Sequence, residues 1–235
     1  QCRKLHNLAN SVIIFDEAQM LPLCHLMPCV AAIGALVEQF GATAVLCTAT
    51  QPVLGDLIQR FAPSHAVSEI CPEIPFYFDK FRRVTFRQVG VLEDDALAEL
   101  LCAHEQVLCI VNSRKAAQSI FSKLPEEGSF HLSTLMVPAH RRTVLEQIRR
   151  RLNDGLPCRV VSTSLVEAGV DIDFPAVYRE LAGLDSILQA AGRCNREGKR
   201  AAEDSIVTIF RRTEKAPPLF GQAIGATNIA LDNNA

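Results

Sequence analysis

The chain has 235 residues, of which 49% are hydrophobic, and its formal net charge at pH 7 is −2. This hydrophobic share can build a large core and excludes disorder over most of the length. The small net charge excludes a globally basic nucleic-acid binder, so any such contact must come from local clusters of Arg and Lys. Two clusters are present: Arg141, Arg142, Arg149, Arg150 and Arg151, and then Arg193, Arg196, Lys199 and Arg200.

The nine cysteines are odd in number and irregular in spacing, and no CxxC pair occurs. This pattern disfavours both a disulfide framework and a zinc site. We therefore expect free thiols and a cytoplasmic protein. No apolar run is expected to reach the roughly 18 residues that a membrane span needs, and the N-terminus carries no signal-peptide pattern, so no membrane partner is expected.

Apolar runs alternate with longer amphipathic stretches along the first part of the chain. The pattern predicts a strand over residues 11–15 that is buried on both faces, and a helix over 28–40 that ends at Gly41. A second strand over 43–47 and a short helix over 54–61 follow. Pro72 and Pro75 then lie among aromatic and charged residues, which indicates an inter-lobe connection over 72–83.

The alternation resumes beyond this connection. Strands are predicted over 84–89, 106–111, 130–134, 159–162, around Val177 and over 206–210, and helices over 94–104, 114–124, 139–152 and 186–191. Residues from 216 onward, with Pro217 and Pro218, are expected to be weakly structured. Buried strands separated by helices predict an α/β fold with parallel sheets covered by helices. We expect a first lobe over 1–71, a linker over 72–83, a second lobe over 84–215 and a tail over 216–235.

Polar residues follow the first two strands directly. Ligands of open parallel sheets bind at the carboxyl ends of the strands, where Asp16 can hold Mg²⁺ and Glu17 can orient or deprotonate an attacking water. Two solvated acids at the end of a strand are the ordinary alternative. Thr48 and Thr50 follow the second strand, and their hydroxyls can couple to this acidic segment, although such residues also form turns and helix caps.

Two later segments carry similar chemistry. Gly169 permits the backbone to approach a phosphate or ribose, and the hydroxyl of Thr163 suits a sugar-phosphate contact, although a plain glycine turn is the alternative. Arg193 and Arg196 are three residues apart, so a helical turn places them on one face together with Gln189. Two guanidinium groups there can clamp a γ-phosphoryl group. A solvated basic helix end is the alternative.

With these clusters in this order, the chain resembles superfamily 2 helicases, whose motor consists of two RecA-like lobes that close on ATP. Residues 16–19 match motif II, 48–50 motif III, 163–171 motif V and 189–196 motif VI, and residues 110–114 look like motif IV. In detail, the sequence is most similar to the CRISPR-associated helicase–nuclease of type I interference systems. The similar phrases are IFDEAQ (14–19), CTATQP (47–52), LST (132–134), VEAGVDIDF (166–174) and AGRCNREG (191–198).

The resemblance implies ATP and Mg²⁺ as cofactors and an ATP-dependent DNA helicase as the activity. It also implies single-stranded DNA and a guide-RNA surveillance complex as partners, and an HD nuclease domain in the parent chain. By role, it assigns catalysis to Asp16, Glu17, Gln189, Arg193 and Arg196, metal binding to Asp16, nucleotide contacts to Gln19, Gly169 and Asp171, nucleic-acid contacts to Asn112, Arg114 and Thr163, and coupling to Thr48 and Thr50.

Two features of the family are missing from these 235 residues. There is no GxxxxGK[ST] phosphate loop, and no histidine is followed by aspartate as in an HD nuclease. We therefore expect an incomplete first lobe, and no ATP hydrolysis by these residues alone. Two alternatives stay open: a superfamily 2 helicase that acts on RNA or on repair DNA, and a degenerate lobe pair that binds nucleic acid without hydrolysis.

Overall fold

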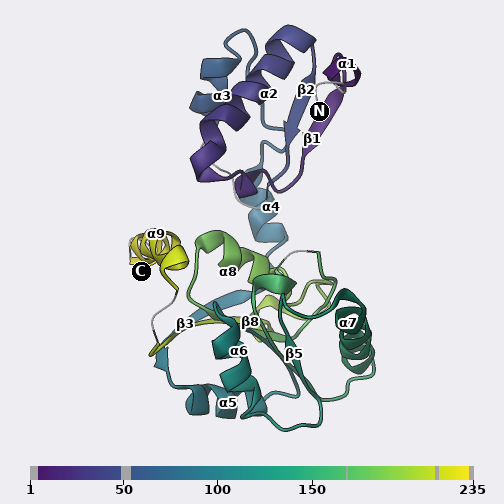
Figure 1. Ribbon diagram of the computed structural model, residues 1–235, viewed down its shortest axis with the longest axis vertical. Coiled ribbons are helices and arrows are strands. Elements are labelled where there is room, and N and C mark those ends of the chain that lie inside the picture. Colours follow the sequence, from purple (N-terminus) through teal and green to yellow (C-terminus); the bar gives the residue numbers. More distant parts are fainter. Residues whose placement is uncertain (1–4, 49–53, 168, 215–216, 233–235) are drawn as a thin grey trace. The chain divides into compact units, whose positions relative to one another are not determined.

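The computed structural model describes residues 5–48, 54–167, 169–214 and 217–232. The chain divides into two units, Gln1–Tyr77 and Phe78–Ala235, and this division falls within the range 72–83 that the sequence predicts as a connection. Each unit contains a parallel sheet with helices (Figure 1). The predicted α/β class is therefore confirmed, and the two units are described separately.

The first unit contains a two-stranded parallel sheet, β1 (Val12–Phe15) beside β2 (Thr43–Leu46). The helix α2 (Leu26–Phe40) connects the strands and ends where Gly41 adopts a positive φ of 61°, as the sequence predicts. Gly34 of α2 packs at backbone distance from another helix, because a Cβ atom there would lie 2.6 Å from both Cβ and the carbonyl oxygen of Phe61. Short helices complete the unit: α1 (Leu5–Leu8), η2 (Ala18–Met20), η3 (Leu23–His25) and α3 (Gly55–Phe61).

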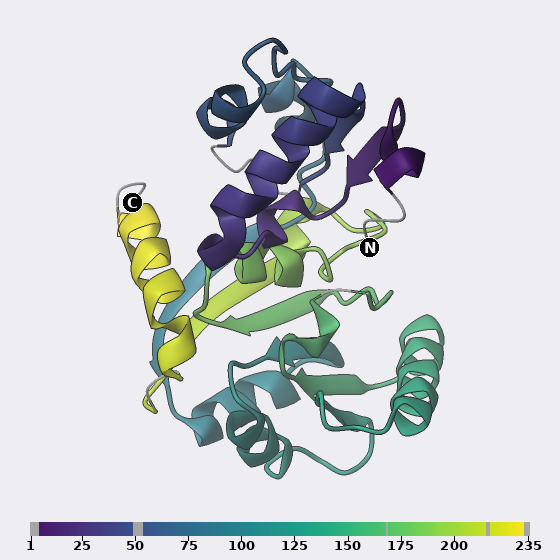
Figure 2. The same ribbon diagram turned by 45° about the horizontal axis from the view of Figure 1, so that its top comes forward.

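The prediction that β1 is buried on both faces is wrong. Val12 and Ile14 are 67% and 65% exposed, whereas Ile13 and Phe15 between them are half-buried. An apolar run shows which side chains favour burial, but burial also needs a packed layer on each face of the strand. Within the described part of this unit, β1 presents one face to solvent, while α2 runs along the sheet (Figure 2).

The connection between the units contains a helix, α4 (Ile74–Lys80). Pro75 is the second residue of this helix. The first turn of a helix has no intrahelical use for the missing N–H, and the fixed φ of proline suits it.

The second unit contains a six-stranded parallel sheet in the order β3-β8-β7-β4-β6-β5. All carboxyl ends therefore lie at one edge, where the residues after β4, β6 and β7 come together. The strands are β3 (Thr85–Leu92), β4 (Gln106–Ile110), β5 (Ser129–Leu132), β6 (Cys158–Ser162), β7 (Ala176–Glu180) and β8 (Ile206–Arg212).

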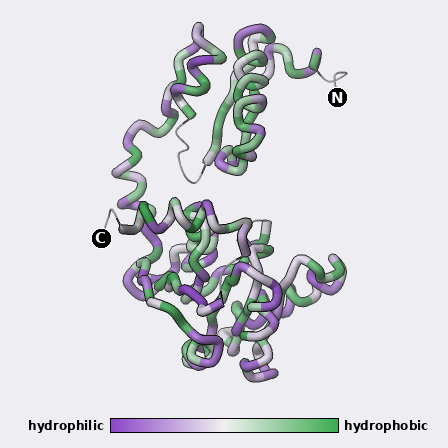
Figure 3. Tube along the Cα trace, turned by 60° about the vertical axis from the view of Figure 1, so that its left-hand side comes forward, coloured by the Kyte–Doolittle hydropathy of each residue, from purple (hydrophilic) through white to green (hydrophobic). Residues whose placement is uncertain are grey.

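Helices cover both faces of this sheet. One hydrophobic cluster joins Leu108 of β4 to Ile148 and Ala190 from two helices, and the other joins Val107 to Ile120. Successive residues of β4 thus point to opposite faces, and hydrophobic positions gather inside the unit (Figure 3). The elements around the sheet are α5 (Asp94–Cys102), α6 (Arg114–Phe121), α7 (Pro138–Asn153), η4 (Ser164–Val166), α8 (Leu184–Ala191), η5 (Ala202–Asp204), η6 (Pro218–Phe220) and α9 (Gly221–Asp232).

The prediction of a weakly structured tail over 216–235 is wrong for α9. Thr227 on this helix is 2% exposed, and Ile224 packs against a small cluster that contains Leu181, Ile187 and Ile209. The helix is held by this tertiary packing rather than by a strong sequence pattern, which is why the sequence did not indicate it. Pro217 and Pro218 stand before the helix, where they do not interrupt its hydrogen bonds.

The stretch Leu23–Phe40 is long and apolar enough to cross a membrane by length and composition, so the expectation that no run reaches this length is wrong. The same test is passed by helices that pack in the core of a protein. In the structure, Val30 and Ile33 are buried, and Gly34 contacts Phe61. The stretch therefore carries no membrane assignment by itself.

The cysteines differ in exposure between the two units. Cys24 and Cys71 in the first unit are exposed, whereas Cys109, Cys158 and Cys194 in the second are buried. Burial raises the pKa of the Cys158 and Cys194 thiols to about 12 and that of Cys109 further, because the thiolate form loses its hydration.

Candidate nucleotide and nucleic-acid sites

The acidic segment lies at the carboxyl end of β1, as the sequence predicts. Asp16 and Glu17 are exposed, and the Glu17 N–H donates a hydrogen bond to Asp16 Oδ1 at 3.0 Å. The Ala18 N–H donates to the Cys47 carbonyl at 2.9 Å, which ties this segment to the end of β2. Two carboxylates are thus displayed to solvent from a fixed backbone.

Glu17 adopts a left-handed backbone conformation, with φ 53° and ψ 44°. Such a conformation is uncommon for a residue with a side chain and clusters at functional sites. Gln19 donates from Nε2 to Glu17 Oε2, and its own Oε1 is buried without a hydrogen-bond partner in the described structure. Thr48 is half-buried directly after Cys47, and Thr50 lies outside the described residues.

The acidic segment fits a metal ion that is bound through one or two carboxylates, as Mg²⁺ often is, better than an ion that is enclosed by protein ligands. Asp16 supplies a carboxylate at the surface, and the described residues contain no cluster of three or more His, Cys, Asp or Glu side chains that could surround a metal. Mg²⁺ commonly binds through one or two carboxylates together with water and phosphate oxygens. The residues present are compatible with that mode.

The second unit brings the predicted nucleic-acid residues into one groove of about 410 Å³. The groove lies at the carboxyl edge of the sheet, after β4, β5 and β6. Ser113 caps α6 by accepting a hydrogen bond from the Ala116 N–H at 3.1 Å, so the positive end of the helix dipole is at the groove. The lining residues are Asn112, Ser113, Arg114, Lys115, Thr134, Thr163, Ser164 and Pro217.

The polar groups of this groove suit an anionic backbone. Arg114 and Lys115 are exposed cations in the first turn of α6. Thr163 is 7% exposed, and its Oγ1 has no hydrogen-bond partner in the described structure. An unpaired buried hydroxyl is unfavourable unless a ligand or water completes it. Phosphate and sugar oxygens can accept from such hydroxyl and cationic donors.

Asn112 is placed at this groove but its side chain is already engaged. Its Nδ2 donates to the Leu181 carbonyl at 2.8 Å, and its Oδ1 accepts from Arg179 Nη1 at 2.8 Å. Its N–H donates to Glu180 Oε2 at 2.7 Å. One amide hydrogen is left for a ligand, so Asn112 chiefly fixes the shape of the groove.

The prediction that Arg193 and Arg196 share a helical face is wrong. The helix α8 ends at Ala191, and Asn195 then adopts a positive φ of 47°, which turns the chain. Arg193 is 8% exposed, and its guanidinium donates to the carbonyls of Val166 at 2.8 Å and Glu167 at 2.6 Å. Arg196 is exposed. A three-residue spacing places side chains on one face only while the helix continues.

Arg196 meets a different predicted residue, Asp171, whose Oδ1 lies 2.8 Å from Arg196 Nε. Arg149 of α7 donates to the Asp171 carbonyl at 3.0 Å. Gly169, nearby in sequence, is exposed and has φ 68°, a conformation that favours glycine. An added Cβ would meet no atom within 4 Å, so the backbone conformation, and not close packing, accounts for glycine at this position. Gln189 is half-buried in the last turn of α8. Asp171 and Arg196 therefore form one exposed site, and Arg193 lies in another environment.

Sequence reasoning missed a buried charged group around Arg179. This arginine is 1% exposed, and its Nη2 lies 3.0 Å from Oε1 of Glu167, which is 6% exposed. Burial raises the pKa of the Glu167 and Glu180 carboxyls and lowers the pKa of Arg179, because each loses hydration of its charged form. The available signal was the pair of adjacent charges, Arg179 and Glu180, at the end of an otherwise apolar strand.

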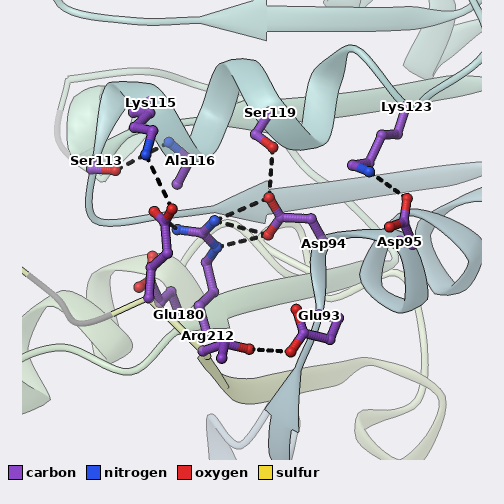
Figure 4. Close-up of polar contacts among 12 residues, drawn as sticks. Glu93, Asp94, Asp95, Ser113, Lys115, Ala116, Ser119, Lys123, Glu180 and Arg212 are labelled. Atoms are coloured by element: carbon purple, nitrogen blue, oxygen red, sulfur yellow. Dashed lines mark hydrogen bonds and ion pairs between the residues drawn. The ribbon is translucent and has the colours of Figure 1, made fainter.

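A second buried ion pair joins β8 to the helices α5 and α6 (Figure 4). Arg212 Nε and Nη2 donate to the two carboxylate oxygens of Asp94 at 2.9 and 3.0 Å, and Ser119 donates to Asp94 Oδ2 at 2.6 Å. The Arg212 side chain is 7% exposed. This two-pronged pair connects the start of α5 with α6 and β8.

The comparisons with known proteins agree with this geometry. A family model described as "CRISPR-associated nuclease/helicase Cas3, C-terminal" matches residues 103–199, which include most of the groove and Arg193. A protein of that name from Haloferax volcanii is 37% identical over 83 residues. Over these residues the chain is similar to the C-terminal part of Cas3. Another such protein, from Methanothermobacter thermautotrophicus, is 28% identical over 146 residues.

The matched part of this chain spans a small share of the length of these relatives. The match covers 34% of this chain and 9% of the Haloferax protein, and 59% of this chain and 18% of the Methanothermobacter protein.

Solved structures show the same fold. "Crystal structure of T. fusca Cas3-AMPPNP" has a TM-score of 0.67 at 15% identity and covers 95% of this chain and 33% of that one. The Mycobacterium smegmatis helicase Lhr bound to ssDNA and AMP-PNP has a TM-score of 0.57 at 19% identity and covers 88% and 30%. The predicted RecA-like fold is confirmed.

Proposed function

We propose that the protein containing this chain is an ATP-dependent DNA translocase and helicase of CRISPR type I interference, acting in the cytoplasm. The observation that carries this proposal is the groove of the second unit, where Asn112 and Arg114, which follow β4, meet Thr163, which follows β6. The family match over residues 103–199 supports it.

Single-stranded DNA is the proposed occupant of the groove. Arg114 and Lys115 bind phosphates, while the unpaired Thr163 hydroxyl donates to a backbone oxygen. No base-specific reading is needed for a translocase, and backbone contacts of this kind are independent of sequence. The similar fold of the Lhr helicase, which was solved bound to ssDNA, supports this class of ligand.

ATP is the proposed substrate, and its hydrolysis drives the motor. Asp16 holds Mg²⁺, and Glu17 activates the attacking water from its exposed position after β1. Mg²⁺ neutralises charge on the phosphate oxygens when it is bound. Gln19, Gly169 and Asp171 contact the nucleotide, while Thr48 and Thr50 couple its hydrolysis to movement. The similar Cas3 structures with ATP and with AMP-PNP support a nucleotide ligand.

The roles of the basic segment follow its burial. Arg196 is the better candidate to stabilise the γ-phosphoryl charge, since its guanidinium is exposed and needs only to leave Asp171. Arg193 acts by holding residues 166 and 167, to which it is bonded. Gln189 positions the segment from α8.

The partners are proposed by family similarity. A guide-RNA surveillance complex recruits the protein, and an HD nuclease domain in the parent chain cuts the DNA that the motor delivers. A structure described as "CRISPR RNA-guided surveillance complex, pre-nicking" is among the structural neighbours. The 235 residues alone do not sustain turnover, because they contain no phosphate loop.

The test is steady-state ATP hydrolysis by the full-length protein with Glu17→Gln. We expect the rate stimulated by single-stranded DNA to fall at least about 100-fold, the usual contribution of a general base. Glu73→Gln is the matched control, since Glu73 is also an exposed glutamate of the first unit. An unaltered stimulated rate in Glu17→Gln contradicts the assignment, and stimulation by RNA rather than DNA favours the RNA-helicase alternative.

A further inference from the structure

A continuous chain of buried polar contacts crosses the carboxyl edge of the second unit. It starts at Asn112 in the groove, whose Oδ1 accepts from Arg179 Nη1 at 2.8 Å. Arg179 Nη2 lies 3.0 Å from Glu167 Oε1. The Glu167 carbonyl then accepts from Arg193 Nη2 at 2.6 Å. Three contacts thus join the proposed DNA groove to the basic segment after α8.

The two side chains that Arg179 joins, Asn112 and Glu167, belong to different loops. Asn112 follows β4, whereas Glu167 follows η4 in the segment that also contains Thr163 and Gly169. The two loops are bridged by the two terminal nitrogens of one guanidinium group. This group is planar and rigid, so a displacement of one loop changes the contact with the other.

Stability alone does not account for these buried charges. Removing two opposite charges from water costs several kcal/mol per ion, and a buried pair therefore often adds little net stability. Arg179 is 1% exposed, and its Nε has no hydrogen-bond partner in the described structure. Burial of Arg179 therefore costs free energy at a site where an apolar side chain could occupy the same volume of the core.

We propose that Arg179 is a positioning residue that transmits strand binding at the groove to residues 163–171 and Arg193, so that DNA accelerates ATP hydrolysis. The inference rests on the proposed function. It adds a specific residue and a path, since Arg179 contacts neither the proposed DNA nor the nucleotide and acts through Asn112 and Glu167.

The second buried arginine offers a matched comparison. Arg212 also binds a carboxylate with two nitrogens and is also nearly buried, but its bonds reach Asp94 at the start of α5. Ser119 of α6 completes that cluster, which Figure 4 shows. Lysine at either position keeps the positive charge but cannot bridge two partners as a guanidinium does.

The experiment compares Arg179→Lys with Arg212→Lys in the full-length protein. ATP hydrolysis is measured without DNA and over a range of single-stranded DNA concentrations, together with DNA affinity by fluorescence anisotropy. We expect Arg179→Lys to reduce the DNA-stimulated kcat about tenfold, a typical coupling between sites. Its basal rate and its Kd for DNA should change less than about threefold, and Arg212→Lys should keep full stimulation.

The outcomes separate the two proposals. Full stimulation in Arg179→Lys overturns the positioning role, and so does an equal loss in both variants, which indicates general destabilisation. If Arg179→Lys does not fold, Glu167→Gln tests the same path, because it keeps the shape of the side chain and removes its charge. Wild-type protein that DNA does not stimulate overturns the proposed function itself.

Discussion

The acidic segment of the first unit and the basic segment of the second hold their charges in opposite ways. Asp16 and Glu17 are exposed at the end of a two-stranded sheet. Arg193 is 8% exposed beside a six-stranded sheet and bonded to two backbone carbonyls. The first segment exposes its carboxylates, which in the described structure bond only to neighbours within the segment, whereas the second uses Arg193 to fix the backbone of residues 166 and 167.

This difference teaches that residues of a shared motif can divide their work by burial. Arg193 and Arg196 are three residues apart, yet one organises residues 166 and 167 and the other stays available at the surface. Buried polar networks become rigid when every member is satisfied. Exposed charges remain adaptable and contribute little to stability.

The largest expected effect is on the stability of the second unit. Arg193→Ala removes the two hydrogen bonds that the described structure shows to the Val166 and Glu167 carbonyls, so the opening free energy of this unit should fall by about 3 kcal/mol. Asp16→Ala removes an exposed side chain and should change that of the first unit by less than about 0.5 kcal/mol. Native-state hydrogen exchange on the full-length protein measures both. Equal costs would break the comparison.

A packing change in the first unit tests how much the close approach of α2 and α3 contributes to its stability. In Gly34→Ala the new Cβ would lie 2.6 Å from Phe61, so α2 and α3 must separate, at a cost of about 2 kcal/mol. Gly55→Ala is the control, because its Cβ would meet nothing within 4 Å, and it should be neutral or stabilising by about 0.5 kcal/mol. Hydrogen exchange at the β1 amides reads out both, and equal effects would contradict close helix packing.

The smallest effect concerns pH. Burial raises the pKa of Glu180 above its ordinary value of 4.5, among the charges of Arg212, Arg179 and Asp94. The folded state then holds this proton more tightly than the unfolded state, so wild-type stability falls as pH rises from about 4.5 through the raised pKa. Glu180→Gln lacks this loss and should gain stability relative to wild type as pH rises.

Urea denaturation at pH 4.5, 5.5 and 7.0, monitored through amide exchange in β7, measures the difference in stability between Glu180→Gln and wild type. Groups that titrate equally in both proteins cancel. A difference that shrinks as pH rises would show that the carboxyl of Glu180 is stabilised as an anion.

Local features of the chain were predictable where short-range chemistry decides them. The position of Asp16 after an apolar strand follows from sequence alone, and Gly41 ends α2 because glycine tolerates its φ of 61°. The order of strands and helices in the second unit also follows from hydrophobic periodicity. Thr163, Arg114 and Asn112 meet because parallel strands share one carboxyl edge.

Features decided by tertiary contacts were not predictable in this way. The end of α8 at Ala191 depends on Asn195, whose Nδ2 binds the carbonyls of Arg83 and Arg200 at 2.9 and 2.8 Å. The pairing of Arg179 with Glu167 joins two segments across the sheet edge. The exposure of Val12 depends on which elements pack on β1. The local pattern can mark a position, as the adjacent charges Arg179 and Glu180 do, but it does not show the partner across the fold.

The distribution of thiols makes the two units unequal towards an electrophile. Maleimide dyes react with accessible thiols in their thiolate form. Cys24 and Cys71 are exposed, whereas Cys109, Cys158 and Cys194 are buried and have raised pKa values. Among the described cysteines, a fluorophore would therefore react first at Cys24 and Cys71, in the unit that carries Asp16 and Glu17, and less at the half-buried Cys102 of the other unit. Spectroscopy of the first unit during turnover would need no removal of the buried cysteines, whose volume the core of the other unit requires.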